Sequence, residues 1–293
     1  MRRLLALALI GFAAQLVDGA LGMGHGVTST TLLLAVGTAP AAASASVHLA
    51  EVGTSLSAGV AHWHFGNVDR RVLVRIAGPG ALGAFLGALL LSRLSTEAAA
   101  PWMSGILTAL GLCLLLRFTR RLPPRRPRPL GSRHLAPLGL VAGFVDATGG
   151  GWGPVATPAL LVGGRLEPRK AVGTVDTAEC LVAVSAAVGF LVGLGRSGFA
   201  TTTVIAMMAG GVMAAPIAAW LVRRLPAQIL GSALRGLIVL TNVHGLLDVV
   251  HAGPGSRWAL HGAVLVLWGW ALGIALRVHR NSRPPLPGVP VPA

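Results

Sequence analysis

The chain has 293 residues, of which 54% are hydrophobic and 11% are charged, and its formal net charge is +15. A soluble domain carries roughly a quarter charged residues, so this composition excludes an ordinary soluble domain and favours a membrane protein. The arginines stand in short clusters between apolar runs, which argues against nucleic-acid binding, and two cysteines are too few for a disulfide framework or a metal–thiolate cluster.

The apolar runs predict an all-α polytopic membrane protein with about eight or nine spans, because a helix of about 20 apolar residues crosses a bilayer. In chain order the runs cover residues 4–21, 22–38, 41–61, 72–91, 101–116, 135–148, 171–194, 201–221, 229–250 and 258–277. We divide the chain into a first transmembrane repeat (1–116), a basic Pro-rich linker (117–134), a second transmembrane repeat (135–250), an extra C-terminal helix (251–279) and a disordered tail (280–293).

The two halves are also related in sequence. A shift of 128 residues aligns Gly11 with Gly139, Asp18 with Asp146, Gly22 with Gly150, Pro40 with Pro168 and Glu51 with Glu179. Apolar composition does not explain an aligned Asp and an aligned Glu, so we predict two homologous helical repeats, as in many secondary transporters. The recurrence also favours a first helix over a signal peptide at the N-terminus. Whether the repeats are parallel or inverted depends on whether residues 22–38 cross fully, and both options stay open.

The linker carries seven arginines and four prolines between residues 117 and 134. Proline at this density prevents a helix, and the charge keeps the segment out of the bilayer. The positive-inside rule therefore predicts a cytoplasmic linker. Arg2 and Arg3 would share that side if each half crosses an even number of times.

Glycines follow the first helix of each half, at Gly22, Gly24, Gly26, Gly150, Gly151 and Gly153. Each costs about 1 kcal/mol in a helix, so we expect the backbone to unwind there and form Gly-rich broken helices. Broken helices expose N–H groups and positive helix ends that attract anions, which makes these glycines candidate substrate-binding residues. The alternative is that they only allow close helix packing.

Ionisable side chains inside the apolar runs are the second set of candidates: Asp18, His48, Glu51, Asp146, Asp176 and Glu179. Such residues are costly in lipid and face the protein interior. His48 and Asp176 each lie three residues before a glutamate, on the same helical face. Burial favours the neutral form of a carboxyl group, so these residues could carry protons or orient the breaks. A purely structural role is the equal alternative.

His25, His48, His62 and His64 raise the question of a metal, but the chain has no HExxH motif, and we predict no metal site. There is no nucleophile–His–acid arrangement and no phosphate-binding loop. The sequence therefore predicts neither an enzyme nor a cofactor.

At these residues the chain resembles the TauE/SafE family of sulfite exporters, also called the TSUP family. The stretches from Asp18 to Gly24 and from Asp146 to Pro158 look like its two repeat signatures, and Pro40 and the stretch from Ser46 to Glu51 also fit. The resemblance runs from about Leu4 to Val250. It implies a bacterial inner-membrane protein that moves sulfite, sulfoacetate or related small anions.

We therefore expect a multi-pass inner-membrane secondary transporter that exports a small inorganic or organosulfur anion, with proton coupling as one option. Its partners would be that anion and membrane lipid, with no nucleic acid; a homo-oligomer is a further option. Ionised carboxylates would repel sulfite, so some of the acids should be protonated or paired. The alternatives are a divalent cation carrier, which would use the acids and His48 directly, and a membrane accessory subunit without transport.

Overall fold

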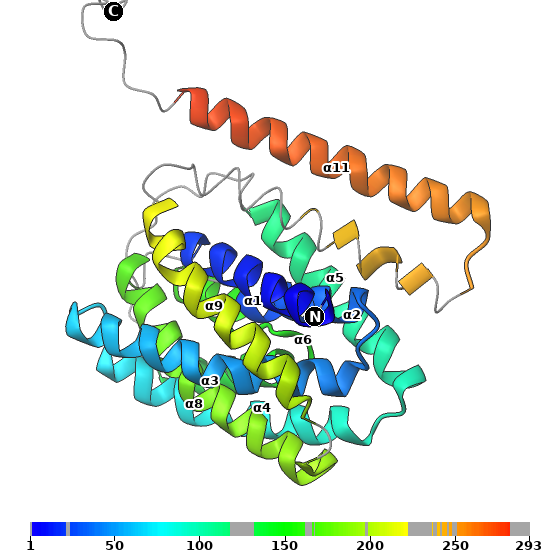
Figure 1. The fold of residues 1–293 in the computed structure, drawn as a ribbon. Helices are drawn as coiled ribbons and strands as arrows, with labels where there is room; N and C mark the ends of the chain where they lie inside the picture. The colour runs from blue at the N-terminus through cyan, green and yellow to red at the C-terminus, as the bar shows by residue number, and fades with distance from the viewer. Residues whose placement is uncertain are drawn as a thin grey trace, which may run out of the picture.

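The computed structural model describes residues 2–21, 24–117, 132–161, 166, 168–196, 199–221, 236, 239–240, 242–244, 246–247 and 251–281. This part of the chain is helical, without strands (Figure 1). Its helices are α1 (Arg2–Leu21), α2 (His25–Ala35), α3 (Pro40–His64), α4 (Arg70–Arg93), α5 (Thr96–Arg117), α6 (Ser132–Gly149), α7 (Trp152–Leu161), α8 (Pro168–Leu194), α9 (Thr201–Leu221) and α11 (Pro254–Asn281).

These helices follow the predicted apolar runs closely, with one addition. α7 occupies a stretch in which the sequence predicted a Gly-rich break and no helix, and its residues include Pro154 and Pro158. Pro154 sits in the first turn, where a missing N–H breaks no helical hydrogen bond. The predictions for most of the linker, for residues 229–235 and for residues 282–293 lie outside the described residues.

In the described part of the chain, three helices are long and apolar enough to cross a membrane: Arg70–Arg93 of α4, Lys170–Leu194 within α8 and Pro254–Arg277 within α11. α3 is just as long but carries a polar interior face that includes Ser44, His48 and Glu51, all buried. Buried polar groups lower the hydropathy of a helix that lines the protein interior. The full number of spans stays a prediction.

The first helix of each half packs against a late helix of the other half. α1 lies against α9 and α6 lies against α4, while α3 lies against α8. The backbones approach so closely that a Cβ atom added at Gly83 would overlap the carbonyl oxygen of Leu140, and one added at Gly210 would overlap that of Ala8. Small residues allow such close packing in membrane helices.

The contacts fix the directions of the helices. Along α3, His48 stacks near Phe190 and His62 pairs with Asp176, so α3 and α8 run antiparallel. Residues later in α4 contact residues later in both α6 and α8, so these three helices run parallel. α9 begins a few residues after the end of α8 and runs in the opposite direction, parallel to α1, which lies beside it.

We name the two ends of the bundle after α3, which begins at the Pro40 end and finishes at the His64 end. α1, α5 and α9 also begin at the Pro40 end, and α4, α6 and α8 begin at the His64 end. Arg2 therefore lies at the end opposite to the helix termini that the linker joins.

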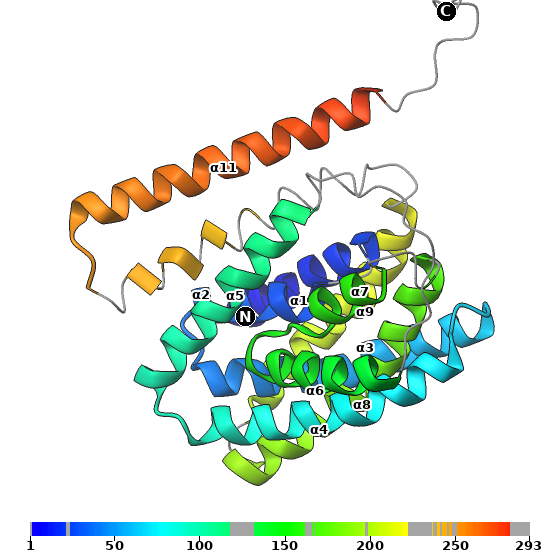
Figure 2. The same cartoon turned by 180° about the vertical axis from the view of Figure 1, so that it is seen from behind.

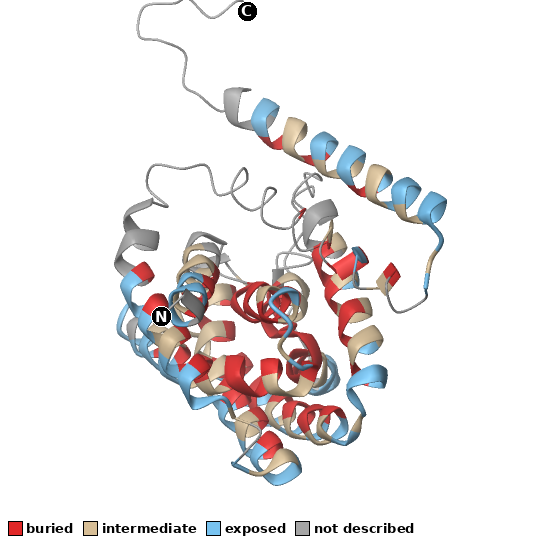
Figure 3. Ribbon diagram, turned by 45° about the vertical axis from the view of Figure 1, so that its right-hand side comes forward, coloured by how far each residue is buried: buried red, intermediate tan, exposed pale blue. Residues whose placement is uncertain are grey.

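Buried residues fill the centre of the bundle, as Figure 3 shows. α11 lies along the outside, beside α5, and is largely exposed (Figures 1 and 2). An apolar helix with an exposed surface is suited to contact with lipid.

Candidate functional site

Two broken helices enter the bundle from opposite ends and meet inside it. α1 starts at the Pro40 end, and α2 finishes close to the start of α3 at that same end. α6 and α7 make the corresponding hairpin at the His64 end. α2 has 11 residues and spans about 16 Å, about half of a bilayer. α2 leads back to the end at which α1 starts, so α1 and α2 together do not carry the chain from one end of the bundle to the other, an arrangement that the sequence did not predict.

The two breaks touch through their glycines. Gly24 and Gly150 have φ angles of +111° and +72°, which only glycine adopts readily. A Cβ atom added at Gly150 would overlap the backbone of Gly26 and Val27. Gly151 follows in the same break and Gly153 lies in the first turn of α7, while Gly22 lies outside the described residues.

A carboxyl group already occupies the start of the half-helix α7. The backbone N–H of Trp152, the first residue of α7, donates to Oδ1 of Asp146 at 2.8 Å. In the other half, Asp18 and His25, the first residue of α2, line the same small cavity. A carboxylate at a helix N-terminus satisfies free N–H groups and the helix dipole. The N–H of Trp152 is therefore engaged by the protein itself rather than left open for an anion.

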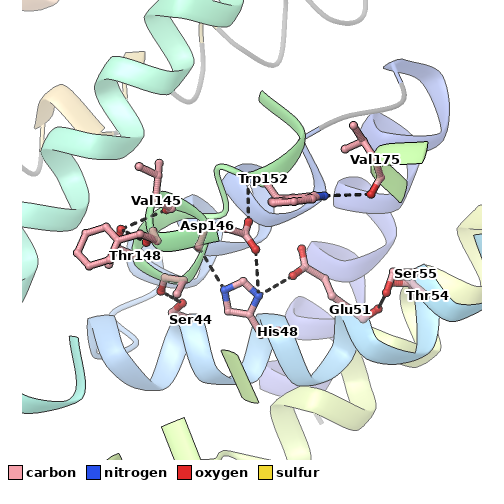
Figure 4. A network of polar contacts seen from close by, with 12 residues as sticks. Ser44, His48, Glu51, Thr54, Ser55, Val145, Asp146, Thr148, Trp152 and Val175 are labelled. Atoms are coloured by element: carbon pink, nitrogen blue, oxygen red, sulfur yellow. Dashed lines mark hydrogen bonds and ion pairs between the residues drawn. The ribbon is translucent and has the colours of Figure 1, made fainter. Parts of the chain in front are cut away.

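His48 joins the first repeat to the second at this point (Figure 4). Its Nδ1 lies 2.9 Å from Oε2 of Glu51 and 3.8 Å from Oδ2 of Asp146, and its Nε2 lies 3.2 Å from the carbonyl oxygen of Asp146. All three side chains are at most 2% exposed. The ring also stacks on Phe190, at 6.2 Å between centroids.

The number of protons in this group follows from its geometry. A carbonyl oxygen only accepts, so Nε2 of His48 carries the hydrogen that it donates to Asp146. Nδ1 and the carboxylate of Glu51 would repel each other if both were unprotonated, so they share one proton. That proton sits on nitrogen in an ion pair or on oxygen in a neutral pair.

Acids from both halves line one small cavity of about 20 Å³ beside this group. Its lining includes Asp18, Glu51, Asp176 and Glu179, together with His25. The volume holds about one water molecule. Asp146 reaches this group through His48, so the structure brings all six sequence-predicted ionisable residues into one region of the protein interior.

Sequence reasoning missed one partner in this region. Nε2 of His62 lies 3.1 Å from Oδ2 of Asp176, and Nδ2 of Asn67 lies 3.4 Å from Nδ1 of the same ring. The sequence analysis considered His62 only for a metal. No group of three potential metal-binding His, Cys, Asp or Glu side chains occurs among the described residues. The signal available in the sequence was Asp176, an acid in an apolar run whose hydrogen-bond partner had to come from another helix.

An all-helical bundle with apolar spans and ionisable groups in its interior is the architecture of a membrane transporter. The model of the sulfite exporter TauE/SafE family matches residues 7–244, and the chain belongs to this family.

Two relatives come from Bacillus subtilis (strain 168). The chain is 48% identical over 272 residues to the "Probable membrane transporter protein YtnM", which covers 92% of this chain and 91% of that protein. It is 27% identical over 237 residues to the "Probable membrane transporter protein YdhB", covering 79% and 94% of the two chains. No solved structure matches the chain.

Proposed function

We propose that this membrane transporter is a secondary carrier that exports a small anion, such as sulfite or an organosulfonate, across the bacterial inner membrane, coupled to protons. The observation that carries the proposal is the family match over residues 7–244, since that family is described as sulfite exporters. Transport, rather than an enzymatic reaction, is the function of such a protein.

An inverted pair of repeats supports a carrier of this kind. The equivalent helices α3 and α8 run antiparallel, and the two hairpins enter from opposite ends. Inverted repeats around a site at mid-membrane are the basis of alternating access in many carriers. The touching Gly26 and Gly150 lie where such a site would be.

The basic residues support an orientation. Among the described residues, the His64 end carries Arg70, Arg71, Arg117, Arg133, Arg169 and Lys170. α11 begins beside His244 at the Pro40 end, so Arg277 near its other end lies toward the His64 end as well. The sequence that joins α5 to α6 contains five further arginines. The Pro40 end carries Arg2, Arg3, Arg93, Arg196 and Arg257. The positive-inside rule then places the His64 end in the cytoplasm.

A cysteine at position 132 should therefore be protected from an impermeant thiol reagent in intact cells. In a variant without Cys113 and Cys180, we expect Ser132→Cys to react only after the cells are opened. Ser95→Cys, exposed at the Pro40 end, is the matched control and should react from outside. Labelling of Ser132→Cys in intact cells would reverse the orientation and place the linker outside.

The shared proton of His48 and Glu51 supports coupling. It lies in contact with Asp146, which caps α7, so a change of protonation alters the charge beside the break of the second repeat. Charge changes at buried pairs shift conformational equilibria because unpaired buried charges are costly.

Uptake into inside-out proteoliposomes tests the function. Purified protein should carry radiolabelled sulfite inward, faster when an imposed pH difference drives protons the other way, while a divalent cation panel stays at the level of empty vesicles. Flux of a divalent cation instead would favour the cation carrier. No flux of any solute, from protein that is folded by circular dichroism, would favour an accessory subunit.

A further inference from the structure

A second cavity, much larger than the acid-lined one, opens at the Pro40 end. We call it the Thr31 pocket; it has a volume of about 450 Å³. Its walls come from the last turns of α2, the α2–α3 turn, the first turns of α3 and α5, and Asn242. Hydroxyl and amide groups therefore meet here from parts of the chain far apart in sequence.

Two hydroxyl groups that line the Thr31 pocket, those of Ser104 and Thr31, offer hydrogens that no described residue accepts. Ser104 is 7% exposed, and its hydroxyl makes no hydrogen bond with any described residue. Thr31 is 1% exposed; its Oγ1 accepts from Nδ2 of Asn242 at 2.9 Å, and its own hydrogen reaches no acceptor among those residues. A buried donor without an acceptor is costly, so both hydroxyls are suited to a bound ligand.

The electrostatics of the pocket favour a negative ligand. α3 begins at Pro40 and α5 begins at Thr96, and both residues line the pocket, while α2 ends beside it at Ala35. Two positive helix ends and one negative helix end therefore face the pocket. No Asp or Glu is among its lining residues; Glu97 follows Thr96 but is exposed. In the acid-lined cavity, by contrast, four carboxyl groups surround space for about one water molecule.

α2 connects the two cavities with further unpaired hydroxyls. His25 lines the acid-lined cavity and Thr31 lines the larger pocket, six residues or about 9 Å along the helix. Between them, Thr28 and Ser29 are buried, and their hydroxyl oxygens have no hydrogen-bond partner. Their hydroxyl groups continue the row of hydrogen-bond donors from the Thr31 pocket toward Gly26 and Gly150, where the two broken helices touch.

We infer that the Thr31 pocket is a binding site for a small oxyanion, sulfite or a sulfonate head group, held by the hydroxyls of Thr31 and Ser104. The inference rests on the proposed function, and it separates the anion site from the acid cluster. With the His64 end in the cytoplasm, this is the site from which an exported anion leaves the protein.

Calorimetric titration of the purified full-length protein with sulfite tests the site directly. Ser104→Ala and Thr31→Val should each weaken binding about tenfold, as expected for loss of a hydrogen bond to an anion. Thr31→Ser keeps the hydroxyl and should bind like the wild type. Thr108→Val is the matched control on α5, because the Thr108 hydroxyl already donates to the carbonyl oxygen of Ser104. The melting temperatures of Ser104→Ala, Thr31→Ser and Thr108→Val should agree with that of the wild type, whereas Thr31→Val removes the acceptor of the Asn242 hydrogen bond and should melt at a lower temperature.

The outcomes separate the site from the function. If Ser104→Ala and Thr31→Val bind sulfite like the wild type, the pocket inference is wrong, whatever the flux. If the wild type neither binds nor carries sulfite but binds thiosulfate or methanesulfonate, and both variants weaken that binding, the site stands and the assigned substrate falls. If no oxyanion of this panel binds, the pocket inference fails even where sulfite flux is measured.

Discussion

Replacing Gly150 with alanine should reduce anion flux by at least about tenfold. The φ angle of +72° at this residue costs an alanine about 1–2 kcal/mol. In addition, the new Cβ atom would overlap the backbone of Gly26 and Val27, which cannot move without separating the two breaks. Flux in proteoliposomes, normalised to inserted protein, measures the effect.

Two glycines serve as controls for this prediction. Gly195 has a φ angle of +66° but no neighbouring atom within 4 Å of a new Cβ, so Gly195→Ala isolates the backbone strain and should keep most of the flux. Gly151 has no positive φ angle, and a new Cβ atom there would overlap mainly the side chain of Val145 and press on that of Leu110. Gly151→Ala should therefore lose less flux than Gly150→Ala. Wild-type flux in Gly150→Ala would show that contact between the breaks is not needed for transport.

The variants Glu51→Gln and Glu179→Gln should fold and insert but lose the pH dependence of transport. Glutamine keeps the shape and hydrogen-bonding capacity of glutamate without titrating. In Glu51→Gln the amide still reaches Nδ1 of His48, but the pair no longer exchanges its shared proton. Flux measured from about pH 5.5 to 8.5, where histidines and buried carboxyl groups titrate, should become flat and several-fold lower.

Glu97→Gln provides the control, because Glu97 is exposed in the first turn of α5. Its flux should follow the wild-type pH profile. If Glu51→Gln and Glu179→Gln also follow that profile, both acids have a structural role only, and damage should then appear with alanine at the same positions.

Much of the fold could be predicted because apolar length and glycine position are local properties of the chain. The ends of α4, α8 and α9 lie within a few residues of the predicted runs. The helix α7 could not be predicted, since its two prolines argue locally against a helix that tertiary packing supports. The directions of the helices could not be predicted either. The charges in the connecting segments are compatible with parallel and with inverted repeats, and the choice depends on whether the short helix α2 leads back to the end at which α1 starts.

The residues that form the site could be predicted better than the contacts between them. A charged residue in an apolar run must face the interior, so Asp18, Glu51 and Glu179 were identifiable one by one. The link between Asp146 and His48 joins residues 98 positions apart, and no spacing rule encodes such a contact. The engagement of the Trp152 N–H by Asp146 likewise depends on how the chain turns at Gly150.

The crossed packing of first and late helices has a consequence for biosynthesis. Gly11 of α1 meets Met207 of α9, a separation of 207 − 11 = 196 residues. At about 5–20 residues per second, the ribosome needs roughly 10–40 s to make that intervening chain. During this time α1 lies in the membrane with its small-residue surface uncovered, and the nascent protein relies on lipid or the insertion machinery to shield it. Completion of the chain, rather than of either half, is therefore the event that commits this protein to its fold.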